Sequence, residues 1–438
     1  MKTFVALPVL LAGSVMLAGC FDGDNDAAEV NASVRILHAS PDAPAVDIAV
    51  DGDVILTGVA FQQGTGYLSL AAGQREVSIL VGGTEILSEV FALDAGSSYS
   101  IIAQGPAASL ALKPLDETAR RSNGTIDVTV VHASPAAGEV DVSVTAPSDT
   151  LPTTPTLDNV PFGADATLES VVGGDYRVRV TPGAGGDVVY DSGTLPVAAD
   201  VTAVAVNSTK GASPVSLLVW ADSDTPITTV LDDSAEVRIV HAVDAVTVDV
   251  YAGGALLLED FAYQTDTGYV KVKSGALDVA VAPADQGIGN AVASLSGTLD
   301  LERGESYTVI AAGDVNKLPE TRLIVLVDER EFNSDTEGKV RLVHASSASA
   351  ADPVDIYVVA SGAAVSGDPA FADVVFGQDT GYVSLPAATY DAVIAADGTT
   401  APAVPNTAGL AIGAGDIFTG IAIGDASGLD AIVLDDRR

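Results

Sequence analysis

VRILHASPDAPAVDIAV (residues 34–50) holds one of the four histidines of this 438-residue chain. The same phrase returns three times, and each return carries one of the other histidines. The histidines recur about one hundred residues apart, a spacing too long for a solenoid repeat and suited to one small domain per copy. We therefore expect four tandem domains. The later copies read VTVVHASPAAGEVDVSV (128–144), VRIVHAVDAVTVDVYA (237–252) and VRLVHASSASAADPVDIYV (340–358).

A second repeated phrase follows each histidine. VAFQQGTGYLSL (59–70) recurs as VPFGADATLESV, FAYQTDTGYVKV and VVFGQDTGYVSL. Each copy continues through short segments in which apolar and polar residues alternate, separated by Gly, Asn, Asp and Pro. Period-two alternation is typical of half-buried β-strands, and these turn residues favour tight connections. Roughly seven such strands per copy predict an all-β chain of four tandem immunoglobulin-like β-sandwich domains.

The alignment of the copies sets the expected boundaries. Short polar segments at 116–124, 222–234 and 328–338 separate the copies. We predict that these segments act as hinges between domains arranged like beads on a string. The expected parts are a signal peptide (1–19), a lipidated cysteine with an acidic tether (20–32), and four β-sandwich repeats (33–117, 125–222, 235–328 and 338–438).

The first twenty residues have the pattern of a processing signal. Lys2 precedes the apolar run FVALPVLLAGSVMLA, which is too short for a permanent membrane span. LAGC (17–20) then matches the lipobox of bacterial lipoproteins, and Cys20 is the one cysteine of the chain. We predict lipidation at Cys20, which leaves no thiol for disulfides, metal ligation or catalysis. Phe21 replaces the Asp that retains enterobacterial lipoproteins at the inner membrane, so the expected location is the bacterial cell envelope, at the outer membrane.

The chain is strongly acidic. It has 59 Asp and Glu against 20 Lys and Arg, which gives a formal net charge of −39. Such a surface repels nucleic acid phosphates, so we expect no nucleic-acid partner. The expected partners are the membrane, through the N-terminal lipid, and an envelope protein or a glycan.

The repeated histidines are His38, His132, His241 and His344. Alternation along the first strand places His38 on the same face as Val34 and Ile36, whereas Arg35 begins the opposite face, which we expect in solvent. A histidine at the inner end of a strand is most simply a packed ring whose nitrogens bond nearby backbone. We therefore predict a structural role for all four histidines.

The same positions could also belong to a catalytic or a metal site. A serine follows each histidine by two residues except in the third copy, where Val243 stands, so no repeated Ser–His pair results. Asp47 and its counterparts point away from the apolar face, which favours local bonds to turns over a buried His–Asp dyad. One histidine and no cysteine per domain do not suffice for zinc, and we expect no metal or cofactor. Calcium between Asp-rich turns stays open.

The Thr-Gly-Tyr and Asp-Thr-Gly-Tyr phrases supply the other candidate site. They place Tyr67, Tyr269 and Tyr382 at one position, and the second copy has Leu168 there. An exposed tyrosine at this position could stack on a sugar or anchor a partner. A tyrosine bonded to backbone at a sandwich corner is the alternative.

The phrases VRILHASPDAPAVDIAVDG and FGQDTGYVSLPAATYDAVIA resemble a bacterial family of secreted domains, domain of unknown function 4397. The resemblance covers residues 33–438 as four units and is strongest in the first copy. It implies a sandwich fold and an exported or surface setting, and it implies no activity.

Together these patterns predict a non-enzymatic, lipid-anchored envelope protein with an adhesion, ligand-binding or structural spacer role. Two alternatives stay open. One is a carbohydrate-binding surface protein that uses the Thr-Gly-Tyr loops, and the other is a hydrolase with a site that the sequence does not reveal.

Overall fold

The computed structural model describes nine stretches of the chain, and their regular structure is β-strand apart from short 3-10 turns and the helical residues 118–119. The predicted signal peptide, Cys20 and most of the acidic tether lie outside the described residues. The strands form eight sheets that pack as four pairs, which confirms the predicted all-β chain of four sandwiches. The described stretches are 31–119, 124–183, 185–221, 227–244, 246–314, 321–347, 352–401, 407–425 and 428–438.

The first two domains occupy the N-terminal half of the chain. The strands of the first domain are β1 (Asn31–Ala39), β2 (Val46–Val50), β3 (Asp53–Val59), β4 (Leu68–Ala71), β5 (Gly73–Val81), β6 (Thr84–Leu93), β7 (Ser98–Gln104) and β8 (Ala111–Asp116). Those of the second are β9 (Ile126–His132), β10 (Val140–Thr145), β11 (Leu157–Val160), β12 (Asp165–Val171), β13 (Gly174–Pro182), β14 (Tyr190–Asp191), β15 (Leu195–Val197), β16 (Val201–Asn207), β17 (Val215–Ala221) and β18 (Thr228–Val230).

The last two domains repeat the plan. The strands of the third domain are β19 (Ser234–Asp244), β20 (Val248–Ala252), β21 (Ala255–Phe261), β22 (Asp266–Lys273), β23 (Gly275–Pro283), β24 (Gly297–Leu301), β25 (Ser306–Asp314) and β26 (Arg322–Asp328). Those of the fourth are β27 (Glu337–His344), β28 (Val354–Ala360), β29 (Phe371–Val374), β30 (Val383–Pro386), β31 (Ala388–Ala396), β32 (Thr407–Ile412), β33 (Ile417–Asp425) and β34 (Gly428–Asp435). The 3-10 turns are η1 (Ala107–Ser109), η2 (Pro135–Ala137), η3 (Ile288–Asn290) and η4 (Ala293–Leu295).

Each domain divides its strands between two sheets in the same way. In the first domain one sheet has the order β4-β1-β7-β8 and the other β3-β2-β5-β6, and β1 and β7 run parallel. We call the first type the pairing sheet and the second the outer sheet in every domain. Immunoglobulin constant domains instead group their strands as ABED and CFG. The chain therefore has the predicted sandwich architecture with eight strands rather than seven in three of its domains, in an order that differs from the immunoglobulin one.

The first strand of the first domain is buried on both faces. Val34 and Ile36 point between the two sheets of the first domain and belong to its core. Leu37 and Ala39, on the opposite face, belong to a second apolar cluster together with residues of the second domain. Arg35 lies on that same face and is 0% exposed. The prediction that the Arg35 face lies in solvent is therefore wrong, because another domain covers it.

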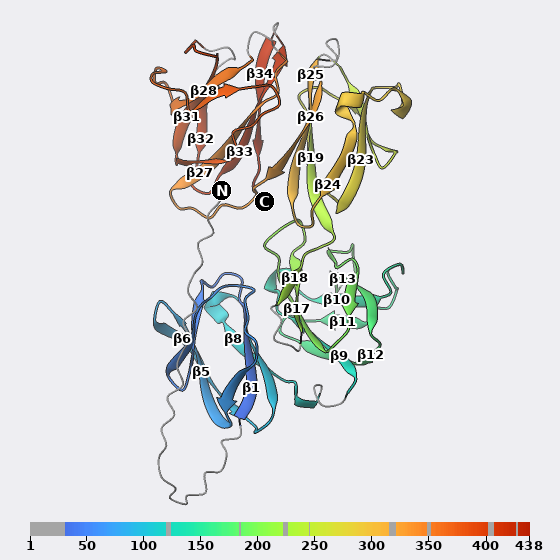
Figure 1. The fold of residues 1–438 in the computed structure, drawn as a ribbon, viewed down its shortest axis with the longest axis vertical. Helices are drawn as coiled ribbons and strands as arrows, with labels where there is room; N and C mark the ends of the chain where they lie inside the picture. Colours follow the sequence, from blue (N-terminus) through green and yellow to red (C-terminus); the bar gives the residue numbers. More distant parts are fainter. Residues whose placement is uncertain are drawn as a thin grey trace, which may run out of the picture.

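The four domains associate in two pairs through their pairing sheets. In the first pair, Leu37 and Ile102 pack with Val204 and Leu218 of the second domain. The third and fourth domains share an equivalent cluster, drawn from β19, β25 and β26 on one side and from β27, β33 and β34 on the other. Figure 1 shows the two pairs as two tiers. Because the domains within a tier share an apolar core, the predicted string of beads is wrong at the first and third linkers.

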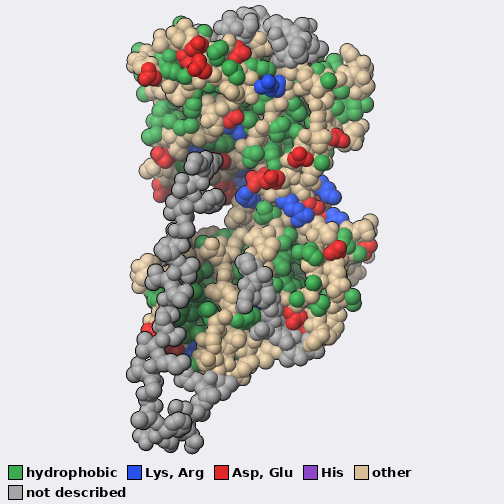
Figure 2. Space-filling model, in the orientation of Figure 1, with side chains coloured by type: hydrophobic (Ala, Val, Ile, Leu, Met, Phe, Trp, Pro, Cys, Tyr) green, Lys and Arg blue, Asp and Glu red, His purple; other side chains and the backbone are tan. Residues whose placement is uncertain are grey.

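The two tiers meet at the second and third domains. β18, from the segment after the second domain, adds a fifth strand to the pairing sheet of that domain. Arg303 of the third domain donates to the backbone oxygen of Ser192 at 2.8 Å and lies 3.0 Å from Asp233. Lys210 and Glu305 form a further ion pair between the tiers. Figure 2 shows Lys and Arg side chains gathered at this level of the molecule.

Candidate functional site

The four histidines lie at the same place in each domain, at the end of the first strand. They are 0–2% exposed, and a phenylalanine ring lies beside each of them. In each domain the backbone N–H and C=O of the histidine bond to the loop before the fourth strand of that domain. The ring of His38 bonds to the turn after β1: Nε2 lies 3.2 Å from the backbone oxygen of Pro44, and Nδ1 lies 3.3 Å from the backbone nitrogen of Ser40.

These contacts define the protonation state of the rings. A carbonyl oxygen can only accept and a backbone N–H can only donate, so Nε2 carries the hydrogen and Nδ1 is bare. His132 and His241 make the same two kinds of contact. Burial lowers the pKa of His38, His132 and His241 below the ordinary value of 6.5, and the bond to the carbonyl oxygen offsets part of this effect. The rings are therefore neutral, with both nitrogens occupied.

The fourth histidine has a different neighbour. Nε2 of His344 lies 3.9 Å from a carboxylate oxygen of Asp352. Its backbone still donates to Gln378 and accepts from Gly377, as in the other copies. The position in the fold is therefore shared by all four histidines.

The aspartates of the second strand bond to turns, as parity predicts. Asp47 accepts from the backbone N–H of Gly58 at 2.8 Å, and Asp141 accepts from that of Asn159 at 2.7 Å. In all four domains the donating residue has a positive φ and interrupts the register between the second and third strands. The aspartate thus holds a β-bulge in the outer sheet, and no His–Asp dyad is formed.

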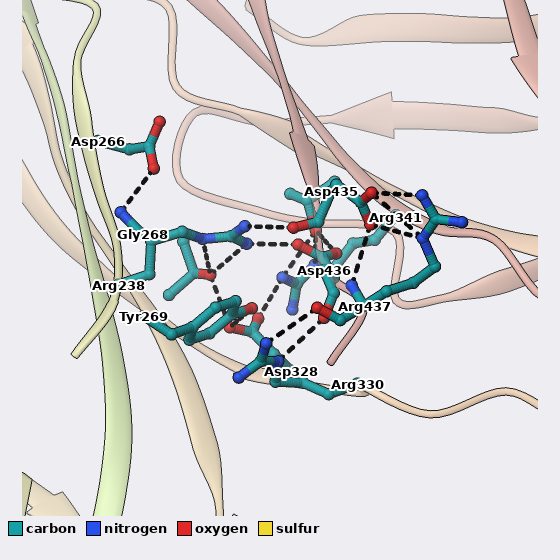
Figure 3. A network of polar contacts seen from close by, with 12 residues as sticks. Arg238, Asp266, Gly268, Tyr269, Asp328, Arg330, Arg341, Asp435, Asp436 and Arg437 are labelled. Atoms are coloured by element: carbon teal, nitrogen blue, oxygen red, sulfur yellow. Dashed lines mark hydrogen bonds and ion pairs between the residues drawn. The ribbon is translucent and has the colours of Figure 1, made fainter. Parts of the chain in front are cut away.

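Polar side chains repeated between the copies meet at the centre of the second pair (Figure 3). Arg341 of the fourth domain forms an ion pair with Asp328 of the third, and its guanidinium also donates to the backbone oxygen of Val327 at 2.9 Å. Arg238 of the third domain forms an ion pair with Asp436 of the fourth. Each arginine thus reaches the carboxylate of the other domain. The third and fourth domains are therefore related by an approximate two-fold axis through this cluster.

The predicted ligand-contact tyrosines belong to these clusters. The hydroxyl of Tyr269 donates to Asp328 at 2.8 Å, and that of Tyr382 donates to Asp436 at 2.7 Å. Burial, together with the neighbouring carboxylates, raises the pKa of both phenols. The guanidinium of Arg238 lies 4.5 Å from the ring centre of Tyr269, and Arg341 lies equally close to Tyr382. Each tyrosine fixes a carboxylate for the arginine of the neighbouring domain.

The first pair is asymmetric. Arg35 pairs with Glu117 of its own domain at 2.9 Å and donates to the backbone oxygen of Ala221 at 2.8 Å. The hydroxyl of Tyr67 donates to Glu117 at 2.5 Å. In the second domain, Trp220 occupies a position where the other domains have leucine, and its ring lies 4.1 Å from the Arg35 guanidinium. The Arg35–Glu117 cluster and Trp220 join this pair, together with an ion pair of 2.7 Å between Lys113 and Asp165.

The co-occurrence of two residue types among the four copies could have predicted these contacts from the sequence. Copies with Arg three residues before the repeated histidine also have Tyr in the later phrase, whereas the second copy has Thr129 and Leu168 at these positions. The joint loss of two residues so far apart in sequence indicates that they act together. An acidic residue at the end of the last strand, or directly after it, completes the set: Glu117 in the first copy, Asp328 in the third and Asp436 in the fourth.

The described residues contain no group of three or more His, Cys, Asp or Glu side chains placed to hold a metal ion. None of the helices in the described part of the chain is long and apolar enough to cross a membrane.

The fold and these clusters define a class of protein built from tandem β-sandwiches that pair through one sheet. The chain belongs to the family of domain of unknown function DUF4397, whose model matches residues 32–143, 235–357 and 347–438. The second domain matches only in its first strands. No curated protein is significantly similar to the chain.

Two solved structures show a distant likeness. One is the Bacillus anthracis TIE protein, with 10% identity, a TM-score of 0.15 and coverage of 88% of this chain and 66% of that one. The other is a product complex of the multi-modular glycogen-degrading pneumococcal virulence factor SpuA, with 10% identity, a TM-score of 0.16 and coverage of 86% of this chain and 38% of that one. TM-scores this low do not establish a shared fold.

Proposed function

We propose that the chain is a non-enzymatic, lipid-anchored protein of the bacterial cell envelope, and that its paired domains form a stiff structural spacer at the outer membrane. The observation that carries this proposal is the use of the repeated residues. The histidines and strand-two aspartates hold loops of their own domain, and the arginines, tyrosines and terminal acids join domains. The repeated residues therefore stabilise the domains and the contacts between them.

The sandwich pairs support the spacer role. An interface with its own apolar core and buried ion pairs resists bending more than a polar linker does. Membrane attachment is supported by LAGC (17–20), with Cys20 as the single cysteine. The acidic composition keeps such a body soluble.

Cys20→Ser tests the anchor. In a bacterial host that processes lipoproteins, the wild-type chain should sediment with the membrane fraction and the variant should appear in the soluble fraction with an unchanged melting temperature. Phe21→Asp is the matched variant: it keeps the lipid and should move the protein from the outer to the inner membrane. If Cys20→Ser remains in salt-washed membranes, the anchoring proposal is wrong.

A glycan array separates the spacer from the carbohydrate-binding alternative. That alternative requires Tyr67, Tyr269 and Tyr382 to offer their rings to a sugar. In the structure their hydroxyls bond to the carboxylates of the domain pairs instead. Specific glycan binding that disappears in Tyr269→Ala, with the pair intact, would favour the alternative.

A further inference from the structure

The second domain encloses an apolar space of about 520 Å³ between its two sheets. Inward-pointing side chains of both sheets form its wall, among them Val128, Val142, Val178 and Ala205. Val128 and Val178 are only partly buried although they point between the sheets. The corresponding spaces in the third and fourth domains measure about 160 and 260 Å³. The second sandwich is therefore the most loosely filled of these three.

The amino-acid sequence explains this space. In the first domain, Ile36 lies beside Ile101 in the pairing sheet, and both are fully buried in the core. In the second domain the same register places Val130 beside Ala203. Each exchange removes side-chain volume from the centre of the sandwich. Three further positions have a larger residue in the first domain than in the second: Ile48 corresponds to Val142, Ile79 to Val180 and Tyr99 to Val201.

The space reaches the surface beside β15. In the first domain the long strand β6 pairs with β5 from end to end. In the second domain two short strands, β14 and β15, take that place and leave the edge interrupted. The exposed residues Pro196, Ala198 and Ala199 belong to the wall, so a ligand can enter from this edge.

The polar groups of the wall are already bonded within the protein. Thr156 accepts from the backbone N–H of Val144 at 2.9 Å, and Tyr176 donates to the backbone oxygen of Val172 at 2.6 Å. Asp200 accepts from the backbone N–H of Asp127 at 2.8 Å. Water in such a space would find few partners, and an empty space of this size is destabilising in proportion to its volume. An apolar molecule in this space would need no hydrogen bonds and would remove the cost of the empty cavity.

We propose that the interior of the second domain binds one neutral molecule with a linear alkyl chain, such as the hydrocarbon part of a lipid that is not the anchor of the chain itself. The volume lies in the range of ligand pockets, and the apolar wall matches hydrocarbon. The net charge of −39 and the wall position of Asp200 disfavour a carboxylate head group. This proposal is independent of the spacer role.

Titration calorimetry with 1-dodecanol tests the site on the full chain in its soluble Cys20→Ser form. The filled variant is Val130→Ile with Ala203→Ile, which installs the residues of the first domain. We expect the Cys20→Ser protein with an unchanged second domain to bind one more molecule of 1-dodecanol per chain than the filled variant does. Without ligand, the filled variant should have the higher melting temperature. The control is Val90→Ile, an exposed position in the first domain, which should bind as wild type does.

Three outcomes would overturn the proposal. They are no binding to the wild-type chain, an unchanged number of sites in the filled variant, and a lipidated chain that refuses 1-dodecanol while the soluble form binds it. The last result would mean that the protein's own anchor occupies the space. Ala203→Ile alone serves as the second filled variant if the double variant folds poorly, and it should weaken binding at least tenfold.

Discussion

The repeated histidine joins two loops to the end of the first strand. Its backbone bonds the loop before the fourth strand, and its ring bonds the turn that follows its own strand. The ring is buried, so it contributes most when it is neutral. Removing it leaves the carbonyl oxygen of Pro44 and the buried N–H of Ser40 without their partner, which costs stability.

His38→Ala should therefore cost about 1–3 kcal/mol at pH 7.5 in the two-domain fragment 31–230, by analogy with buried polar groups that lose their partners. The folded-state pKa of His38 lies below 6.5, so the unfolded chain binds more protons as the pH falls through 6.5. Wild-type stability therefore falls with acidification, and the deficit of the variant should shrink at pH 5.5.

Urea unfolding at the two pH values measures this effect. The control is Ser40→Ala, which removes a buried hydroxyl that has no hydrogen-bond partner among the described residues and which should be almost neutral at both pH values. An equal deficit of His38→Ala at pH 7.5 and 5.5 would contradict a neutral buried ring.

The reciprocal ion pairs give a second prediction for single residues. Arg341→Met leaves Asp328 buried without its guanidinium, and removal of one partner of a buried pair typically costs about 3–5 kcal/mol. Because the pair is approximately symmetric, Arg238→Met should cost a similar amount. The double variant Arg341→Met, Asp328→Leu should be more stable than the sum of the single changes predicts. Denaturant unfolding of the wild type, Arg341→Met, Asp328→Leu and the double variant measures the coupling free energy between the two side chains.

A surface arginine is the control for this comparison. Arg437 pairs with Asp435 in an exposed position, so Arg437→Met should change stability very little. Equal effects of Arg341→Met and Arg437→Met would mean that the buried cluster does not hold the third and fourth domains together.

At the scale of strands and sheets, the sequence predicted the sandwich well and the pairing of domains poorly. Period-two alternation was sufficient to place Val34, Ile36 and His38 on one face of the first strand. The opposite face carries Leu37 and Ala39 beside Arg35. The presence of an arginine in the sequence does not distinguish a face exposed to water from one that packs against another domain. Its partners in the second domain are more than a hundred residues away, so no local pattern could reveal them.

The candidate tyrosines show the same limit. Their recurrence correctly marked a shared position, but their partners are side chains at the far end of the domain. Only a comparison of which residues are lost together in the second copy could have linked them. The apolar space of the second domain was equally hidden, because Val and Ala in place of Ile preserve the alternation that identifies a strand.

At the scale of the whole molecule, the two pairs are the stable units. Apolar clusters join the domains within a pair, whereas the contacts between the tiers include the Lys210–Glu305 salt bridge and the bond from Arg303 to the backbone oxygen of Ser192. Such exposed ion pairs are weakened by salt, and buried apolar contacts are not. The pairs should therefore separate from each other more easily than the domains within a pair.

Limited proteolysis tests this order. Cleavage within 222–227 leaves β18 on the C-terminal fragment, so the two folded fragments of two domains each should separate when β18 leaves the sheet of the second domain. Cleavage within 116–124 should nick the chain without separating the first and second domains, because their shared core holds them together. Denaturing gels report the cuts, and size-exclusion chromatography reports what remains associated. Release of free single domains from the 116–124 cut would contradict the paired arrangement.

The pairing sheet also limits how such a chain can grow. Each domain needs a neighbour to cover its pairing sheet, so copies are satisfied two at a time. A related chain with one copy more or one copy fewer would expose one apolar pairing sheet. That sheet would be expected to pack against the exposed pairing sheet of a second molecule. Duplication in even numbers keeps the protein self-contained, whereas an odd copy number turns an internal contact into the start of an oligomer.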